Sequence, residues 1–370
     1  MTGPMNKYPS VGANFTEDEV IERIQAFRRR RPRLLDEHIT SAHGAGGRAT
    51  AALVDSVFLE SFGNPLLDPL GDGAVIPLPS GDRLAFTTDS FVVRPKRFPG
   101  GSIGTLAVHG TANDLAVSGA VPRWISAAFV LEEGFPIAEL RAIVADMAEA
   151  ATTAGITIVT GDTKVVSKGA SDGVFITTAG LGIIPAGRTL SAGSVRSGDQ
   201  VLLSGPMGDH GMAVMLARGD LDIEADIRSD TASVSPLVEL LLTAAPSTRW
   251  LRDPTRGGVA TACAELATSC GLGVLLHEER LPISPMVAGA CELLGIDPLH
   301  VANEGTFIAV VAPEQATSAL AALRSNPMGA AAVNIGEIID EPGETVIVQT
   351  GFGGRRIVDM LVGDPLPRIC

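Results

Sequence analysis

The stretch IGTLAVHGTANDLAVSGAVPRWISAAFVL, residues 103–131, predicts a helix that leads directly into an apolar strand. The helix spans about 103–118, and the strand spans 125–131. A second helix, over 137–153, leads into a second strand, over 156–160. This alternation of helices and strands predicts an α/β fold, here of the α+β kind, for the first half of the chain.

Outward from this stretch, a helix over 48–61 and a hairpin of strands 74–78 and 83–88 precede it. The glycine- and serine-rich segment 193–199 marks a boundary, after which a second half begins. Its expected helices lie near 209–218, 235–244, 257–270, 285–294 and 314–324, and its expected strands near 200–203, 273–277, 306–311, 333–339 and 345–350.

The chain therefore divides into four parts. We expect an N-terminal extension, which carries a helix after Thr16 and a run of four arginines, and then two domains and a proline-rich C-terminal tail. The tail cannot be helical, because each proline lacks the backbone donor that a helix uses. The expected bounds are 1–37 for the extension, 38–190 and 191–350 for the domains, and 351–370 for the tail.

Composition narrows the class of protein. The 370 residues are 45% hydrophobic, and 28 basic against 42 acidic residues give a net charge of −14, which disfavours a nucleic-acid partner. Four cysteines without CxxC spacing predict neither a zinc site nor a disulfide framework. No apolar run is long enough for a membrane span and the N-terminus has no signal-peptide pattern, so we expect a cytoplasmic protein without a membrane partner.

Five aspartates stand beside small residues at the ends of expected elements. Any one of them alone is typical of a turn or a helix cap. Together they form a set of hard oxygen ligands such as Mg²⁺ requires, and the chain contains no GxxxxGK[ST] phosphate loop. The five are Asp72, Asp89, Asp114, Asp162 and Asp253.

Two glycine-rich segments lead into expected helices. HGAGG, residues 43–47, offers close backbone approach to phosphate through Gly44, Gly46 and Gly47, although an ordinary flexible turn would look the same. DPTRGG, residues 253–258, combines a carboxylate, the cation of Arg256 and free backbone amides. That combination is more specific for a metal–phosphate complex.

Three further residues carry potential chemistry. Cys370 ends a stiff eight-residue arm that spans up to about 26 Å, so its thiol can move between a surface and a pocket. Its own carboxylate opposes thiol ionisation, which suits a thiol that another enzyme modifies, while an incidental terminal cysteine is the simpler alternative. Glu304 and Lys164 are single ionisable groups beside glycine or aspartate in otherwise uncharged segments, and each is either a proton-transfer residue or a surface charge.

Taken together, these motifs resemble the HypE family, the carbamoyl dehydratases of nickel–iron hydrogenase maturation. The resemblance runs from about residue 38 to the end. Most of its motifs are shared with aminoimidazole ribonucleotide synthetase, selenophosphate synthetase and thiamine-monophosphate kinase, whereas the terminal PRIC is specific. It is carried by HGAGG, TTDSFVV, FPGGSIGTLAVHGTANDLAVSGAVPR, GITIVTGDTKVV, SGPMGDHG, DPTRGG, CELLGIDPLHVANEG and PLPRIC.

The resemblance implies a two-domain fold whose N-terminal sheets pair into a barrel across a homodimer, with a mobile C-terminal tail. It implies that ATP and Mg²⁺ bind between the domains, at the five aspartates. It further implies nucleotide contacts from the glycines of HGAGG and from Asn113, Thr163 and Arg256.

The implied reaction takes place on the terminal sulfur. A partner carbamoyltransferase places a carboxamide on Cys370, the carboxamide oxygen attacks the γ-phosphate of ATP, and loss of phosphate and protons leaves a thiocyanate. Lys164 and Glu304 match the positions that assist deprotonation. The cyano group then passes to an iron–cyanide scaffold complex of the maturation machinery.

Two departures and two alternatives remain. Residues 1–37 extend beyond the family core, and GDGA, residues 71–74, has glycine where related families often place a second aspartate, which leaves the number of metal ions open. A selenophosphate synthetase-like kinase is expected to carry a cysteine or selenocysteine in the first glycine-rich loop, and HGAGG has none. A non-catalytic, ATP-dependent docking protein would use the tail only as a ligand.

Overall fold

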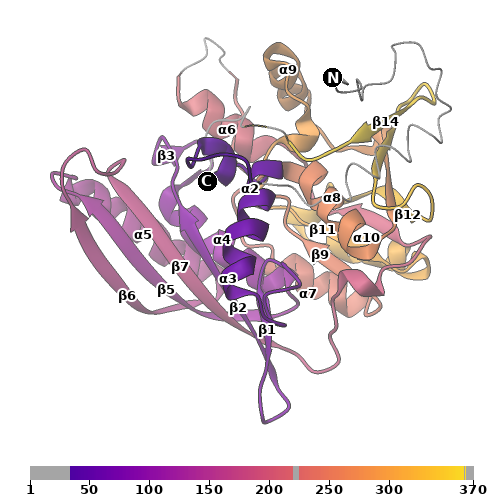
Figure 1. Cartoon of the computed structure of the whole chain (residues 1–370), viewed down its shortest axis with the longest axis horizontal. Coiled ribbons are helices and arrows are strands. Elements are labelled where there is room, and N and C mark those ends of the chain that lie inside the picture. The colour runs from indigo at the N-terminus through magenta and orange to yellow at the C-terminus, as the bar shows by residue number, and fades with distance from the viewer. Residues whose placement is uncertain (1–33, 220–224, 362, 364–370) are drawn as a thin grey trace, which may run out of the picture.

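The computed structural model describes residues 34–219, 225–361 and 363. The expected helix after Thr16, the arginine run and Cys370 lie outside these residues. The described chain forms two sheet-containing domains that lie side by side (Figure 1). No helix in this described part is both long and apolar enough to cross a membrane.

The N-terminal domain contains a five-stranded sheet in the order β1-β2-β7-β5-β6. Strands β5 and β6 are parallel and all other neighbours are antiparallel, so one helical crossover joins β5 to β6. The strands are β1 Ala74–Pro77, β2 Arg83–Phe91, β5 Val121–Glu132, β6 Thr157–Val166 and β7 Val174–Ile184.

Two helices cover one face of this sheet. They are α4, Ile103–Val117, and α5, Ile137–Ala154, and both lie within one or two residues of their predicted bounds. α4 packs on β2, β5 and β7, and its residues are almost all buried because it also faces the C-terminal domain. The opposite face of the sheet, which we call the outer face, is covered by neither of these two helices (Figure 1).

Strand β7 was not predicted, although it is central to the sheet. Glycines interrupt its hydrophobic pattern, so that pattern does not predict a strand here. The structure shows why glycine is needed: a Cβ on Gly180 would lie 2.6 Å from Thr111 Cγ2 on α4. A Cβ on Gly182 would lie 2.8 Å from Ala120 Cβ. The glycines therefore let α4 lie close against the sheet.

The C-terminal domain contains a seven-stranded sheet in the order β14-β13-β10-β12-β8-β11-β9, with helices on both faces. Alternate residues of β8 enter different cores: Val201 and Leu203 pack with α8, whereas Leu202 packs with α7 and α10. The strands are β8 Gln200–Leu203, β9 Trp250–Arg252, β10 Gly273–His277, β11 Ile308–Val311, β12 Val333–Ile339, β13 Val346–Gln349 and β14 Arg355–Val358.

The five helices expected here are all present. They are α6 Asp209–Ala217, α7 Ser235–Ala244, α8 Gly258–Cys270, α9 Pro285–Leu294 and α10 Ala316–Arg324. Two strands, β9 and β14, were not predicted. β14 extends the sheet into residues that we had expected to belong to the tail.

A helical segment crosses the front of the molecule. It comprises α2 Arg48–Leu53, a π-helical turn Val54–Leu59 and α3 Glu60–Phe62. It fills the predicted range 48–61, and the remaining elements of the N-terminal domain are the short strands β3 Arg97–Phe98 and β4 Gly101–Ser102.

Candidate functional site

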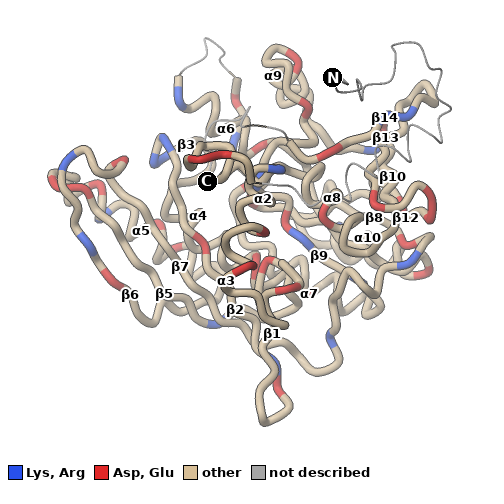
Figure 2. The backbone as a smooth tube through the Cα atoms, in the orientation of Figure 1, with Lys and Arg blue, Asp and Glu red and all other residues tan. Residues whose placement is uncertain are grey.

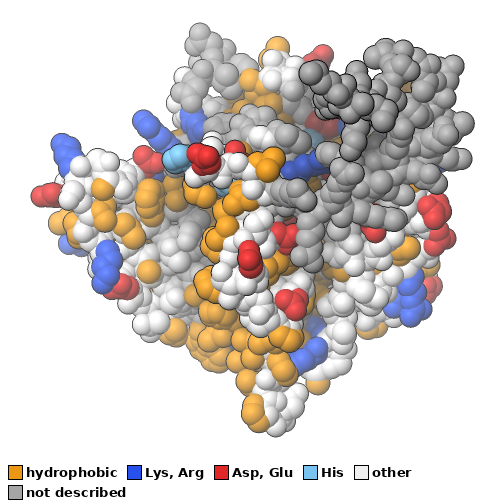
Figure 3. All heavy atoms as spheres, viewed as in Figure 1, with side chains coloured by type: hydrophobic (Ala, Val, Ile, Leu, Met, Phe, Trp, Pro, Cys, Tyr) orange, Lys and Arg blue, Asp and Glu red, His pale blue; other side chains and the backbone are white. Residues whose placement is uncertain are grey.

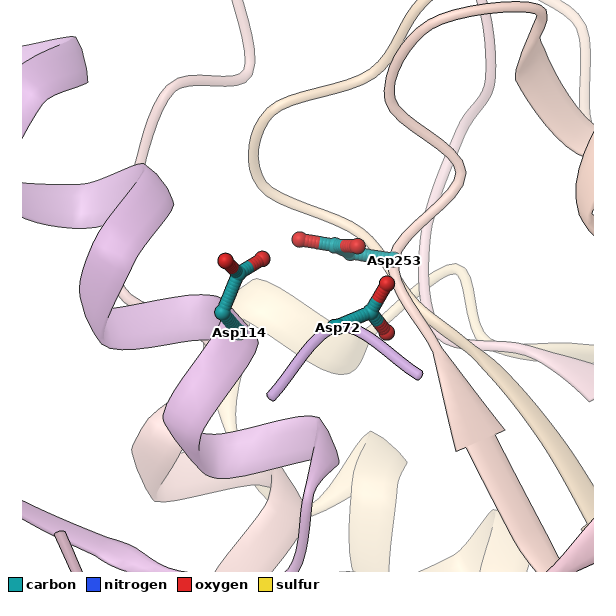
Figure 4. A group of neighbouring side chains, drawn as sticks. All are labelled: Asp72, Asp114 and Asp253. Atoms are coloured by element: carbon teal, nitrogen blue, oxygen red, sulfur yellow. The ribbon is translucent and has the colours of Figure 1, made fainter. Parts of the chain in front are cut away.

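Three aspartates from three separate elements meet between the domains. Asp114 projects from α4, Asp72 lies in the loop before β1, and Asp253 directly follows β9 (Figure 4). One carboxylate oxygen from each lies within 4.8 Å of the others. Three hard oxygen donors at this spacing suit a divalent cation such as Mg²⁺.

Neighbouring side chains hold the three carboxylates in place. The Thr87 hydroxyl on β2 lies 2.7 Å from Asp114 Oδ2 and 2.7 Å from the Asp72 carbonyl oxygen. Arg252 Nη1 lies 3.0 Å from Asp72 Oδ1, and the other side of the same guanidinium binds Glu265 on α8. Thr87 and Arg252 were not predicted; the position of Arg252 immediately before DPTRGG was the available signal.

Burial dominates the electrostatics of this cluster. It raises the pKa of Asp72 and Asp114 well above the ordinary aspartate range and the pKa of Asp253 to about 6. The charges of neighbouring carboxylates add to each shift, although a hydrogen bond with Asp114 lowers the pKa of Asp253. Arg252 opposes the shift at Asp72 and at Asp253. The cluster thus has an excess of negative charge that a bound cation would relieve.

A cavity of about 190 Å³ opens beside the three aspartates. It is lined by the end of β2, by Gly110 and Asp114 of α4, by the loop after β9 and by Glu304. Asp89 on β2 lines this cavity but is not one of the three clustered carboxylates. Burial raises its pKa, and Arg256, also in the wall, opposes that shift.

The glycine-rich loop 43–47 packs against this wall. Arg256 Nη1 donates to the Gly44 carbonyl at 3.4 Å, and a Cβ on Gly46, whose φ is +75°, would lie 2.8 Å from Arg256 Cβ. A Cβ on Gly47 would lie 2.4 Å from the Leu361 carbonyl oxygen. Packing against other parts of the chain is therefore sufficient by itself to require glycine at two of the three positions, Gly46 and Gly47.

The tail begins at this loop. After β14, the Asp359 carboxylate pairs with Arg48 at the start of α2, and the Arg48 amide donates to the Leu361 carbonyl at 3.1 Å. Leu361 also packs against the buried core between the domains. Cys370 follows nine residues later in the sequence and lies outside the described residues.

Glu304 and Asn113 are both buried at the domain junction. Glu304 lines the cavity, and burial, followed by the charges of Asp253 and Asp230, raises its pKa well above the ordinary range. Asn113, which we expected to bind nucleotide, does not line the cavity. Its side chain instead makes hydrogen bonds within the protein.

Asp162, Thr163 and Lys164 lie elsewhere, on the edge strand β6. Asp162 and Lys164 form an exposed ion pair at 3.2 Å, with side chains 61% and 71% exposed, and Figure 2 shows the adjacent acidic and basic positions on this strand. Bonds from the Thr163 backbone and from Lys164 lower the pKa of Asp162. Within one chain these residues do not line the cavity.

The sheet register relates Asp162 to the cavity. Asp162 pairs with Ala128, Ala128 with Thr177, and Thr177 with Ser90, which lines the cavity. These residues therefore form one cross-sheet row, about 14 Å long at ~4.8 Å per strand. Thr87 meets Asp114 of α4 on the helix-covered face, so Ser90, three residues further along β2, projects from the outer face. Side chains of paired residues project from the same face, so Asp162 also projects from the outer face, and so does Lys164, two residues further along β6.

The structure describes three of the four cysteines. Cys263 and Cys291 are buried and Cys270 is half-buried, and none forms a disulfide. Burial raises the pKa of Cys263 to about 12 and that of Cys291 to about 11, which makes both poor nucleophiles.

Comparison with known proteins places the chain in a family. Residues 70–184 match the family described as AIR synthase related protein, N-terminal domain, and residues 196–349 match its C-terminal domain family. Carbamoyl dehydratase HypE of Rhodobacter capsulatus is 52% identical over 91% of this chain and 99% of its own length. Carbamoyl dehydratase HypE of Cupriavidus necator is 50% identical over 90% of this chain and 95% of its own length.

Solved structures agree. The chain resembles HypE in a HypE–HypF complex with a TM-score of 0.80 at 46% identity, over 84% of this chain and 100% of that one. It resembles HypE in complex with ATP with a TM-score of 0.75 at 44% identity, over 89% and 98%. Thiamine monophosphate kinase of Aquifex aeolicus, at 19% identity and a TM-score of 0.61, shares the fold. The chain therefore belongs to the HypE family of carbamoyl dehydratases, within the AIR synthase related proteins.

Proposed function

We propose that this protein dehydrates a carboxamide on the sulfur of Cys370 to a thiocyanate, at the expense of ATP, during maturation of nickel–iron hydrogenases. The observation that carries this proposal is the position of the tail. Leu361 lies against the glycine-rich loop that packs on Arg256, so the tail leaves the domain beside the acidic cavity. Nine further residues span at most about 30 Å, which allows the terminal sulfur to reach that cavity.

The residues of the cavity suit this chemistry. Asp72, Asp114 and Asp253 would hold Mg²⁺, which would offset the charge of the triphosphate. Arg256 and the backbone of the glycine-rich loop would orient the phosphates, and Asp89 would complete the wall. The carboxamide oxygen attacks the γ-phosphorus, ADP leaves and nitrogen releases its first proton; phosphate then leaves carbon while Glu304 accepts the second proton from nitrogen.

We further propose that the active protein is a homodimer closed through the outer face of the N-terminal sheet. Phe86, Leu181 and Trp124 form one cross-sheet row there, and Phe86 and Trp124 are each 41% exposed. Figure 3 shows hydrophobic side chains gathered over α2–α3 and this end of the sheet. A second copy would cover this apolar area and enclose Asp162 and Lys164, which lie outside the cavity of their own chain, whereas Thr163, between them on β6, projects from the inner face.

Two partners follow from the reaction. A carbamoyltransferase must supply the carboxamide, and a relative has been solved as a HypE–HypF complex. An iron–cyanide scaffold must accept the cyano group. We place the reaction in the cytoplasm because the terminal thiol has to stay reduced before it is carbamoylated.

Intact mass spectrometry tests this function. The protein is incubated with the carbamoyltransferase, carbamoyl phosphate and ATP; we expect a carbamoylated species that then loses the mass of one water molecule. Cys370→Ala should abolish both species and leave ATP affinity unchanged. A wild-type protein that binds ATP and tail-directed partners but never loses water would instead be a docking protein.

A further inference from the structure

The loop that carries Glu304 is held rigidly from two sides. On one side, the Asp230 carboxylate accepts hydrogen bonds from the Glu304 amide at 3.0 and 3.2 Å and from the Gly305 amide at 2.9 Å. A Cβ on Gly305 would lie 1.8 Å from the Asp230 carbonyl oxygen, so the two backbones are in direct contact. Asp230 itself is half-buried.

Asn113 of α4 holds the same loop from the N-terminal domain. Its Nδ2 donates to the carbonyls of Glu304, at 3.2 Å, and Ala232, at 2.9 Å, and its Oδ1 accepts the Val234 amide at 2.8 Å. An amide side chain has two N–H donors, and here both have a protein partner. The side chain therefore joins the two domains at the Glu304 loop.

A third contact ties this loop to the loop that follows β9. Asn303 Nδ2 donates to the Pro254 carbonyl at 3.0 Å, and Asn303 Oδ1 accepts the Gly208 amide at 2.6 Å. Since Pro254 follows Asp253, the same connection fixes Glu304 relative to the carboxylate cluster. The backbone of Glu304 is thus fixed while its side chain lines the cavity.

We propose that Asp230 and Asn113 are positioning residues that hold Glu304 where the carboxamide nitrogen releases its proton. This inference rests on the proposed function and deepens it. Neither residue lines the cavity, so both act through Glu304 and not on the substrate. A base in a tight cavity must lie within hydrogen-bond reach of the proton that it accepts, so a small displacement of this loop would impair proton removal.

The environment of Glu304 supports this assignment. Burial raises its pKa, and Asp230 is one of the neighbouring charges that raise it further. A carboxylate whose pKa approaches the working pH is a stronger base than an ordinary one. Asp230 therefore both holds Glu304 in position and raises its basicity.

The reaction divides into two stages, and only the second needs this base. In the first, the carboxamide oxygen bonds to the γ-phosphorus, the bond to the ADP oxygen breaks, and nitrogen releases the first of its two protons to solvent. In the second, the C–O bond breaks, phosphate leaves with its electron pair, nitrogen loses its remaining proton and a C≡N bond forms. When the second stage is slow, water can attack the phosphorylated intermediate and return it to carboxamide and phosphate.

A displaced base should therefore waste ATP. The intact enzyme forms one ADP per thiocyanate, whereas a variant with a misplaced Glu304 should form several. Partial unfolding would lower both products equally and leave this ratio at one. The ratio of ADP to thiocyanate thus separates a positioning role from a purely structural one.

The experiment uses the isosteric variants Asp230→Asn and Asn113→Asp in the full chain. Protein carbamoylated on Cys370 is mixed with ATP, and ADP and thiocyanate are measured in a single turnover. We expect thiocyanate formation to slow by roughly tenfold or more, the ratio to rise well above one, and ATP affinity to stay within about twofold of wild type. Asp199→Asn is the matched control, because Asp199 is a buried aspartate that likewise accepts a backbone amide, from Arg196 at 2.8 Å, but does not line the cavity.

A double variant tests whether the effect passes through Glu304. Adding Asp230→Asn to Glu304→Gln should cause no further loss of rate, because the base is already absent. The positioning role would be overturned if the rate losses of Asp230→Asn and Glu304→Gln were fully additive. It would also be overturned if the single variants had the wild-type rate and formed one ADP per thiocyanate. In either case, thiocyanate formation by the wild-type protein would still uphold the proposed function. Wild-type protein that forms no thiocyanate would overturn both.

Discussion

At the scale of single residues, the chemistry of the cavity depends on carboxylates that are removed from water. The sequence predicted Asp72, Asp114 and Asp253 from their small neighbours and their places at element ends, and the structure brings these three together. It could not predict Thr87, Arg252 or Asp230, because a side chain that orients another residue has no distinctive local pattern. Nor could it predict that the side chain of Asn113 is bonded within the protein.

Asp253→Asn tests the cation site. Removing one of three clustered charges should weaken the affinity for ATP in the presence of Mg²⁺ by roughly tenfold or more, and should weaken it much less without Mg²⁺. Titration calorimetry with and without Mg²⁺ measures both affinities. Asp199→Asn, at a residue outside the cavity wall, should change neither affinity. Equal ATP affinities for the wild type, Asp253→Asn and Asp199→Asn in the presence of Mg²⁺ would exclude Asp253 from the cation site.

The pH dependence of stability tests the environment of Asp230. Burial raises its pKa to about 6, although the amide hydrogen bonds from Glu304 and Gly305 oppose the shift. The folded state therefore holds this proton to higher pH than the unfolded state, where the pKa is 3.8, and stability falls as pH rises from about 4 to 6. Asp230→Asn cannot ionise, so its unfolding free energy relative to wild type should improve by up to about 3 kcal/mol across that range. Urea unfolding without nucleotide at each pH measures the difference, and a constant difference would contradict the assigned shift.

At the scale of elements, hydrophobic period and turn residues were sufficient for most helices and for both strands of the predicted hairpin. They failed at β7, where Gly180 and Gly182 break the apolar pattern for the sake of α4. They also failed at β9 and β14, which are three and four residues long and take their conformation from neighbouring strands. Where packing against other elements determines which residue types a strand can contain, the local hydrophobic pattern does not identify that strand.

Gly180→Ala tests the close packing of α4 on β7. The added methyl would lie 2.6 Å from Thr111 Cγ2 and 2.9 Å from Leu115 Cδ1, so α4 must shift, at a cost of about 1–3 kcal/mol of unfolding free energy. Gly289→Ala on α9 is the matched control, because a Cβ there meets nothing within 4 Å and alanine favours the helix. Urea unfolding should show a loss for the first variant and none for the second.

At the scale of the whole molecule, the two faces of the N-terminal sheet have different uses. The inner face binds α4 and α5 and places Asp114 and Thr87 in the cavity. The outer face carries the apolar row of Phe86, Leu181 and Trp124 and, on the long edge strand β6, the charged pair Asp162–Lys164. Lys164 can therefore contribute to proton transfer only if a second copy brings its own Lys164 to this cavity.

Mixed dimers test this arrangement directly. If each site takes Glu304 from one chain and Lys164 from the other, Lys164→Ala and Glu304→Gln proteins are each inactive alone, but a mixed dimer contains one site with both native residues. Random re-assortment should then restore about a quarter of the wild-type rate of thiocyanate formation, since half of the dimers are mixed and half of their sites are intact. If both residues act within one chain, every site in the mixture lacks one of them and no activity returns. Mixing Lys164→Ala with the double variant Lys164→Ala/Glu304→Gln is the control, because no pairing of these two chains restores a native Lys164.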